Sequence, residues 1–300
     1  MKPLCYVIDI GTNSARLMLA QLDAEGRVKS AYKLVRTVRT GEGVNATGRI
    51  SAAAIQRVAS ALGEFKHTAF FEHPDLPVYV FATSAVRDAE NRDELLCEIR
   101  MRTGLETEVI SGEAEALLSF TGATGGSGGV IDLGGGSTEA ALGKNGVIEW
   151  KKSFDIGIIR AKDMFGMQDE QTAVRLAYGY AHGLFSKIPS SLKGRDFFAV
   201  GGTATSLAAI LLEMREYDPR KIQGFKVSRA CAEQTLARLL CMSMDERLSL
   251  PGLPPARADV MTCGIAILCA AMDCLGIEEY TASDSDNLEG YVILKRQDGL

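Results

Sequence analysis

Apolar positions along the chain fall into short runs and longer periodic stretches that alternate from end to end. Short runs bounded by glycine predict buried strands at residues 4–9 and 130–132, and each run ends in an aspartate. Apolar residues at helical spacing predict helices such as residues 51–70, where Ser51 is a favourable N-cap. This alternation of strands and helices predicts an α/β fold.

The same order of elements occurs in both halves of the chain. We expect further strands at residues 16–22, 28–38, 78–82, 106–110, 137–142, 147–153, 197–200 and 279–282. We expect further helices at residues 92–102, 112–121, 159–165, 171–185, 201–212, 229–242, 256–274 and 288–296. Each half therefore begins with a three-stranded meander, which predicts two lobes with mixed sheets. We place the boundary at the glycine-rich residues 122–129, so that the lobes are residues 1–121 and 122–300 and the segment between them is a hinge.

Three glycine-rich loops follow predicted strands. Glycine allows a tight turn that brings backbone N–H groups close to an anion, and the third loop opens a helix whose N-terminus favours negative charge. One such loop is weak evidence, but three with Ser or Thr hydroxyls favour phosphate binding over simple turns. The candidate phosphate-binding residues in them are Gly11, Thr12, Asn13, Ser14, Gly134, Gly135, Gly136, Ser137, Thr138, Gly201, Gly202 and Thr203.

Carboxylates accompany these loops. Asp9 and Asp132 occupy corresponding places in the two lobes, and Glu139 closes the second loop. Carboxylates beside phosphate suit Mg²⁺, although each aspartate could instead brace its own loop. Glu113 and Glu115 open a helix, where they either complement the helix dipole or activate water.

The absence of other motifs narrows the chemistry. The chain has neither a Walker-type phosphate loop nor a dinucleotide-binding glycine pattern after a strand. It has three histidines, none in a motif, which argues against histidine metal sites and Ser-His-Asp catalysis. Phosphoryl transfer by carboxylates, Mg²⁺ and backbone N–H groups needs no histidine.

Composition and charge exclude several classes of protein. A hydrophobic fraction of 46% supports packed cores, and a formal net charge of −5 gives no general reason to bind nucleic acid. The longest apolar run, residues 260–272, is too short to span a bilayer, and the chain opens without a secretory signal, so we expect a cytoplasmic protein with no membrane partner. Seven cysteines without C-x-x-C spacing predict reduced core thiols.

Basic residues gather in one segment despite the negative net charge. A solvated strand face and a track for a polyanion both explain this pattern, in which Glu42 is the one acid between residues 26 and 50. The basic residues are Arg27, Lys29, Lys33, Arg36, Arg39 and Arg49.

Taken together, the motifs resemble the exopolyphosphatase/guanosine pentaphosphate phosphohydrolase (Ppx/GppA) family. The resemblance spans nearly the whole chain, and the motifs are specific as a set, whereas Asp-x-Gly-Thr alone indicates only the wider actin/Hsp70/sugar-kinase superfamily. The matching stretches, in order, are DIGTNSARL from Asp9, ATSAVRDAENR from Ala82, VISGEAEA from Val109, DLGGGSTE from Asp132, GGTATS from Gly201 and LPGLPPARAD from Leu250.

This resemblance implies two actin-like (ribonuclease H-like) lobes around a cleft. It implies Mg²⁺-dependent hydrolysis of terminal phosphate from polyphosphate or pppGpp, with Glu115 as the base. Asp132 and Glu139 then serve the metal and the water, Asp9 is a further metal ligand, and Arg16 and Arg87 add positive charge. The resemblance leaves open another divalent cation, an assisting monovalent cation and a homodimer.

Two departures from the family pattern bear on the substrate. Relatives often have an acid before the catalytic Glu, where this chain has Ala114, so Glu113 is our second candidate for the base. Relatives commonly show Ser-Asp-x-Gly-Leu-Arg-Glu-Gly near the end, where this chain reads Ser283-Asp284-Ser285-Asp286-Asn287-Leu288-Glu289-Gly290. The chain stops at Leu300, without the helical domains of longer relatives, so we expect a preference for short polyphosphate.

Two other functions remain open at this point. A kinase would use the same cleft to move a γ-phosphate to a small acceptor, and would need a nucleoside pocket near residues 201–205. A sensor would bind polyphosphate or (p)ppGpp without turnover, but it would have no need of the water-activating Glu115.

Overall fold

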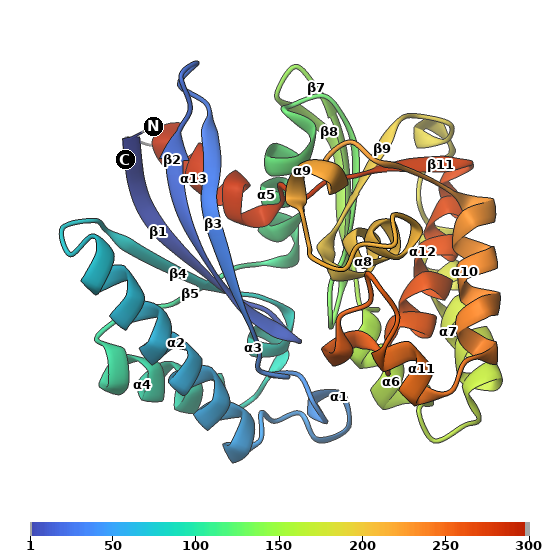
Figure 1. Ribbon diagram of the computed structural model, residues 1–300, viewed down its shortest axis with the longest axis horizontal. Helices are drawn as coiled ribbons and strands as arrows, with labels where there is room; N and C mark the ends of the chain where they lie inside the picture. Colours follow the sequence, from blue (N-terminus) through green and yellow to red (C-terminus); the bar gives the residue numbers. More distant parts are fainter. Residues whose placement is uncertain (1, 298–300) are drawn as a thin grey trace.

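The computed structural model describes residues 2–297 and contains two mixed sheets with helices packed against them (Figure 1). The first sheet has the strand order β3-β2-β1-β4-β5, in which β1 pairs antiparallel with β2 and parallel with β4. The strands of this sheet and the helices that connect or follow them are, in chain order, β1 (Lys2–Ile10), β2 (Ser14–Leu22), β3 (Val28–Thr37), α1 (Val44–Thr47), α2 (Ala52–Glu72), β4 (Val78–Ala82), α3 (Ser84–Asp88), α4 (Arg92–Thr103), β5 (Glu108–Val109) and α5 (Gly112–Thr124).

The second sheet has the order β10-β11-β9-β6-β7-β8, in which β6 pairs antiparallel with β7 and parallel with β9. Its first strands are β6 (Gly128–Leu133), β7 (Thr138–Lys144) and β8 (Val147–Phe154). The remaining elements are α6 (Ile158–Phe165), α7 (Glu170–Phe185), β9 (Phe197–Val200), α8 (Gly201–Leu211), α9 (Pro219–Ile222), β10 (Lys226–Ser228), α10 (Arg229–Cys241), α11 (Met244–Leu248), α12 (Met261–Leu275), β11 (Glu279–Ala282) and α13 (Asn287–Gln297).

The two sheets share one connectivity, as the repeated glycine motif predicts. In each, the first strand lies between an antiparallel meander and a parallel strand reached through helices. The first turns also match, because the Gly11 N–H donates to Ser14 O and the Gly134 N–H donates to Ser137 O. The predicted α/β class and the mixed sheet in each half are therefore confirmed.

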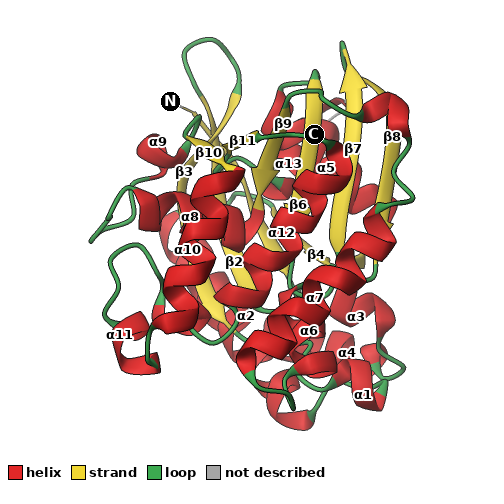
Figure 2. Ribbon diagram, turned by 90° about the vertical axis from the view of Figure 1, so that its right-hand side faces the viewer, coloured by secondary structure: helices red, strands yellow, loops and turns green. Residues whose placement is uncertain are grey.

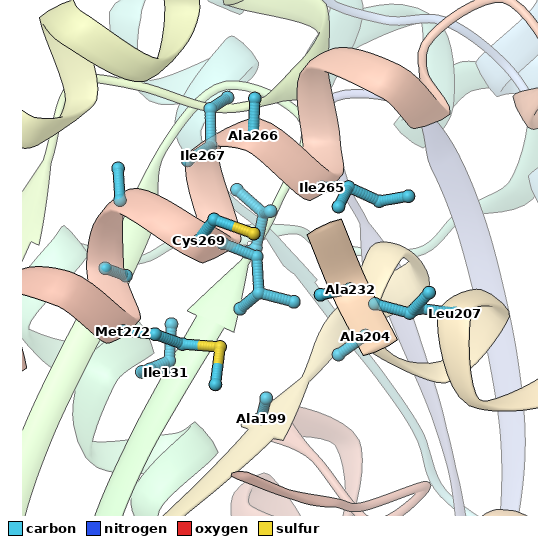
Figure 3. Packing of buried hydrophobic residues seen from close by; sticks show 14 of the residues in the cluster. Ile131, Ala199, Ala204, Leu207, Ala232, Ile265, Ala266, Ile267, Cys269 and Met272 are labelled. Carbon is cyan, nitrogen blue, oxygen red and sulfur yellow. The ribbon is translucent and has the colours of Figure 1, made fainter. Parts of the chain in front are cut away.

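Large apolar clusters cover the outer faces of the sheets. In the second lobe, α12 is buried along nearly its whole length, and Ile265, Cys269 and Met272 pack with Ile131 of β6 in one cluster (Figure 3). Figure 2 shows α7 and α12 in front of the second sheet, with α5 and α13 behind it. The apolar run of residues 260–272 is thus a core helix, and no helix within residues 2–297 has the length and hydropathy to cross a membrane.

Helices α5 and α13 occupy the space between the two sheets. Leu118 of α5 and Leu288 of α13 pack with Val7 and Met18 of the first sheet. The opposite side of α5 contributes Phe120 to a cluster with strand residues of the second sheet. The last helix therefore returns to the first sheet, and α5 contacts both sheets.

The close approach of these two helices explains a glycine within the predicted hinge. A Cβ atom on Gly122 would lie 1.8 Å from the carbonyl oxygen of Asp286, at the start of α13. Residues 122–129 are not one loop, because α5 continues to Thr124 and β6 begins at Gly128. Part of the glycine content of this segment thus serves helix packing.

Other differences from the prediction are local. The predicted helix over residues 256–274 begins only at Met261, because Pro255–Arg257 form a 3₁₀ turn, and the predicted strand over residues 106–110 is reduced to Glu108–Val109. Helices α1, α3, α9 and α11 and strand β10 are too short to produce a clear periodicity, and the sequence did not predict them. All seven cysteines are free, and four of them are buried as expected for core thiols, whereas Cys97 and Cys241 are exposed.

Candidate active site between the lobes

The strand alternation places the two aspartates on facing sheet surfaces. Asp9 shares a face of β1 with Val7, which packs toward α5 and α13. Asp132 shares a face of β6 with Val130, which packs against α5 from the other side. Because both faces turn toward the space between the sheets, both carboxylates reach the same cleft.

Each aspartate is held by a neighbouring side chain. Asp9 Oδ2 accepts hydrogen bonds from Arg16 Nε at 3.0 Å and Nη2 at 2.5 Å, across the β1–β2 pair. Asp132 Oδ2 accepts a hydrogen bond from the Ser119 hydroxyl of α5. The second oxygen of Asp9 is buried and has no hydrogen-bond partner.

Glu139 lies next to Asp132 in the second sheet, on the neighbouring strand β7. It stands opposite Asp132 on β6 and opposite Ser153 on β8. The Ser153 hydroxyl donates to Glu139 Oε1 at 2.6 Å, whereas Oε2 is buried without a partner. This carboxylate is fully buried and does not line the cavity described below.

Glu115 enters the cleft from the first turn of α5. Ser111 caps this helix by accepting the Ala114 N–H, which fixes where the helix begins. The Glu115 side chain is 8% exposed, and its Oε2 accepts a hydrogen bond from Arg87 Nη1 at 3.2 Å. Arg87 also donates to the carbonyl oxygen of Ile110, so the guanidinium is fixed beside the carboxylate.

The predicted loops converge on a cavity of about 100 Å³ between the lobes. Asp9, Glu115 and Asp132 line it, together with Arg16 and Arg257. The predicted phosphate-binding residues that line it are Gly11, Thr12, Asn13, Ser14, Arg16, Gly134, Gly135, Gly136, Ser137, Gly201 and Gly202. The cavity thus joins three carboxylates to three glycine-rich loops.

A helix N-terminus and a guanidinium meet at one wall of this cavity. Gly201 and Gly202 begin α8, whose first N–H groups have no partner within the helix. A Cβ atom on Gly202 would lie 1.8 Å from Arg257 Cζ, so only glycine allows the guanidinium to lie against this turn. The one hydrogen bond that Arg257 donates to a described side chain goes to the Ser206 hydroxyl, at 3.0 Å, and no described carboxylate pairs with it. This wall is suited to a phosphate anion.

The carboxyl groups here hold protons more tightly than they would in water. Burial, together with the negative charges of Glu139 and Asp132, raises the pKa of Glu115 well above its ordinary value despite the opposing Arg87. Burial and the charge of Asp132 raise the pKa of Glu139 to about 8, and burial raises the pKa of Asp132 to about 6. A cation placed among these groups would therefore be strongly stabilising.

The raised pKa values of these buried carboxyl groups predict how the stability of the protein depends on pH when divalent cations are absent. Glu139 has a folded-state pKa of about 8 and an unfolded value near 4.5, so between these values the folded state binds more protons. We therefore expect the free energy of unfolding to fall as pH rises from 5 to 8, on the order of 3 kcal/mol. Thermal unfolding in EDTA across this range measures the effect. Glu139→Gln should flatten the dependence, and an unchanged slope in that variant would contradict the assignment.

The donor set fits a hard divalent cation that is completed by substrate oxygens. Asp9 Oδ1 and Glu139 Oε2 are buried acceptors without partners, and Asp132, which pairs with Glu139 across β6 and β7, lines the cavity with Asp9. Within residues 2–297, no group of three or more His, Cys, Asp or Glu side chains is arranged to hold a metal alone. Mg²⁺ commonly uses one or two carboxylates with water and phosphate oxygens, so these residues fit it.

A family model described as "Ppx/GppA phosphatase family" matches residues 20–296. The chain belongs to this family. Exopolyphosphatase 2 of Mycobacterium tuberculosis is 35% identical over 95% of this chain and 96% of its own length. A guanosine-5'-triphosphate,3'-diphosphate pyrophosphatase of Aeromonas hydrophila is 27% identical over 97% of this chain, which spans 59% of that protein.

Solved Ppx/GppA structures share the two-lobed fold. An exopolyphosphatase-like protein matches with a TM-score of 0.87 and 31% identity, covering 99% of each chain. The Aquifex aeolicus family member matches with a TM-score of 0.79 and 27% identity, over 98% of this chain and 97% of that one. The actin-like, two-lobed fold that the sequence motifs imply is therefore confirmed.

Some predicted site residues of this Ppx/GppA protein lie outside the cavity. Arg87 holds Glu115 instead of lining the wall, and the Thr138 hydroxyl donates to Ile156 O at 2.5 Å. Thr203 is buried in α8 behind the cavity. Glu113, the second candidate for the base, has a side chain that is 71% exposed and lies 3.6 Å from Lys151 Nζ. Its position does not suit it to act on a substrate in this cavity.

The predicted polyanion track is not a free basic surface. Lys33 pairs with Asp284 and Glu289, and Arg39 pairs with Asp259 across the lobes. Three further members of the segment pair with acids: Arg27 with Asp23, Arg36 with Glu64 and Arg49 with Glu94. The pairs of Arg27, Arg36 and Arg49 are exposed, as expected for a solvated strand face, and the polyanion track stays a prediction.

The sequence did not single out several cavity residues. Arg257 was quoted within a family motif but was not assigned to the site, and Asn287 was seen only as a departure from the family pattern. Thr83 and Ser84 also line the cavity after β4, where the sequence shows hydroxyl residues at a strand end. That position at a strand end is the signal that could have identified them.

Proposed function

We propose that this protein hydrolyses the terminal phosphoanhydride bond of inorganic polyphosphate. The observation that carries the proposal is the buried carboxylate of Glu115, held by Arg87 inside a cavity walled by three glycine-rich loops. A carboxylate beside a phosphate site can remove a proton from attacking water. The exopolyphosphatase named among the relatives supports this substrate.

The chemistry assigned to the residues is an in-line displacement by water. Glu115 accepts a proton as the water oxygen bonds to the terminal phosphorus, and the bond from that phosphorus to the bridging oxygen breaks. The electron pair leaves with the shortened polyphosphate, and inorganic phosphate is released. Arg257 and the loop N–H groups stabilise the charge that develops on the phosphate oxygens.

We propose that Mg²⁺ is the cofactor, held by Asp9 and Asp132 with Glu139 behind them. The cavity is lined by three carboxyl groups and two guanidinium groups, so it carries a net charge of −1 when all three carboxyl groups are ionised. When bound, Mg²⁺ supplies positive charge that lowers the pKa of the carboxyl groups and attracts the phosphate.

A second candidate substrate is pppGpp, and a neighbouring cavity favours it. This cavity of about 490 Å³ is lined mainly by apolar side chains, with Arg215 and the half-exposed ring of Tyr217. Pro254 and Pro255 line it and Arg257 lines the phosphate cavity, so the two spaces are adjacent. A cavity of this size accommodates a nucleoside. A pyrophosphatase acting on a guanosine polyphosphate is also among the relatives.

Among polyphosphates, we propose a preference for short chains. The phosphate cavity is small, and most basic side chains of residues 26–50 are paired with acids. Few free cations therefore remain to hold a long polyanion. Equal turnover of chains of tens and of hundreds of phosphates would contradict this preference.

The deciding experiment measures phosphate release from short polyphosphate, long polyphosphate, pppGpp and ATP, with and without Mg²⁺. Release from polyphosphate that requires Mg²⁺ is the expected result. Release from pppGpp alone would keep the residue roles and change the substrate. Binding of polyphosphate without release from any of the four would favour a sensor.

Arg257 is predicted to contribute mainly to substrate binding. Arg257→Met should raise KM for short polyphosphate by about tenfold or more, because a charge-assisted hydrogen bond to phosphate is lost. Steady-state kinetics measure this. Ser206→Ala is the matched control, since it removes only the neutral partner of Arg257. A KM unchanged in Arg257→Met would exclude Arg257 from the binding wall.

A further inference from the structure

Arg16, a predicted phosphate ligand, is occupied by groups of the protein. Its Nε and Nη2 donate to Asp9, its Nη2 also donates to Asn287 Oδ1 at 2.6 Å, and its Nη1 donates to Asp286 Oδ2. A guanidinium has five N–H donors, so at most one remains for a substrate. Arg257, in contrast, has no described carboxylate partner.

Asp286 contacts Arg16 but is not itself part of the cavity wall, whereas Arg16 and Asn287 line the cavity. It stands immediately before α13, and its Oδ1 accepts the Leu288 N–H at 3.0 Å, which fixes the carboxylate at the helix start. Its residue is 6% exposed, so solvent screens its charge weakly.

The balance of charge around Arg16 is negative. Two carboxylates, Asp9 and Asp286, contact one guanidinium, which gives this cluster a formal charge of −1. The ammonium group of Lys33 pairs with Asp284 and Glu289, and its charge also helps Arg16 to lower the pKa of Asp286. Asp286 therefore adds a second negative charge beside Arg16, which offsets the attraction of this guanidinium for a phosphate anion.

We propose that Asp286 is a positioning residue that holds Arg16 away from substrate and lowers the affinity of the cleft for phosphate anions. The proposal rests on the proposed function only in taking phosphate as the ligand of this cleft. The stretch from Ser285 to Leu288 is also where the chain departs from the family pattern. Asp286 thereby makes binding of the substrate anion depend more strongly on a divalent cation.

The test is equilibrium binding of inorganic tripolyphosphate in EDTA, measured by calorimetry. Asp286→Asn keeps an acceptor for the Leu288 N–H and removes the charge. We expect it to lower the Kd for tripolyphosphate by about tenfold, and Asp286→Ala by at least as much, because Nη1 is then free. The factor by which Mg²⁺ strengthens tripolyphosphate binding should be smaller in both variants than in the wild-type protein.

A double-mutant cycle with Arg16→Gln identifies the route of the effect. In the Arg16→Gln background, Asp286→Asn should leave the Kd unchanged, because the guanidinium is absent. Asp284→Asn is the matched control, since Asp284 contacts Lys33 and Tyr217 but not Arg16, and should not tighten binding. Thermal unfolding verifies that each variant is folded.

Two results would overturn the proposal. One is a Kd for folded Asp286→Asn and Asp286→Ala that equals or exceeds the wild-type value. The other is tightening that persists in the Arg16→Gln background. Failure of the proposed function is separate, because it would appear as wild-type protein that releases no phosphate with Mg²⁺, whatever the binding results.

Discussion

Replacing Glu115 with glutamine is expected to lower the rate of phosphate release by about 10²- to 10⁴-fold, the usual contribution of a positioned general base. Glutamine keeps the size of the side chain and can still contact Arg87, which now donates to Glu115 Oε2. It cannot accept a proton from water. We therefore expect kcat to fall with little change in KM, as measured by steady-state release of phosphate from short polyphosphate.

Glu113→Gln is the matched control for this prediction. Both glutamates belong to the first turn of α5, but Glu113 is mostly exposed beside Lys151 whereas Glu115 is buried in the cleft. Activity within about twofold of wild type is expected for Glu113→Gln, as for most exposed sites. A Glu115→Gln variant with near wild-type kcat, or a larger loss in Glu113→Gln, would exclude Glu115 as the base.

The difference between the two glutamates shows what a helix pattern can and cannot predict. Residues two positions apart on a helix point in widely different directions, so only one of them can face a narrow cleft. The family motif favoured Glu115, whereas spacing alone left both open. The direction of the cleft depends on how α5 packs between the two sheets, which is a property of the whole fold.

Local signals predicted most of the architecture. The two Asp-x-Gly loops, the meanders and the strand ends follow from alternation and glycine positions, which are short-range signals, and from the recurrence of one motif in both halves of the chain. The convergence of the three loops also followed, because equivalent strand ends in similar lobes face one cleft. Elements of four or five residues, such as α1, α3 and α11, lack the length to produce a period and were missed.

Long-range partners could not be predicted from the sequence. Arg16 contacts Asp286, which immediately precedes α13, and Asn287, which is the first residue of that helix. Lys33 likewise pairs with Asp284 and Glu289. The return of α13 to the first sheet creates both sets of contacts, and nothing in the local pattern of residues 26–50 indicates that their charges are neutralised.

Gly122 is the position at which we expect the largest loss of stability from a small change. Gly122→Ala places a Cβ atom 1.8 Å from the carbonyl oxygen of Asp286, where backbone and not a flexible side chain must move. That oxygen also accepts the Gly290 N–H in the first turn of α13. We expect a loss of about 3 kcal/mol or more in the free energy of unfolding, the upper part of the range for overpacked cores.

Gly183→Ala provides a matched control in another helix. Gly183 lies within α7, and a Cβ atom there meets no other atom within 4 Å. The same substitution should therefore stabilise the protein by up to about 1 kcal/mol, since alanine is the better helix former. Urea unfolding of both variants measures the contrast. Equal effects at the two positions would show that α5 and α13 do not pack as described.

Because α13 begins beside Asp286 and Asn287, Gly122→Ala should also alter tripolyphosphate binding, whereas Gly183→Ala should not.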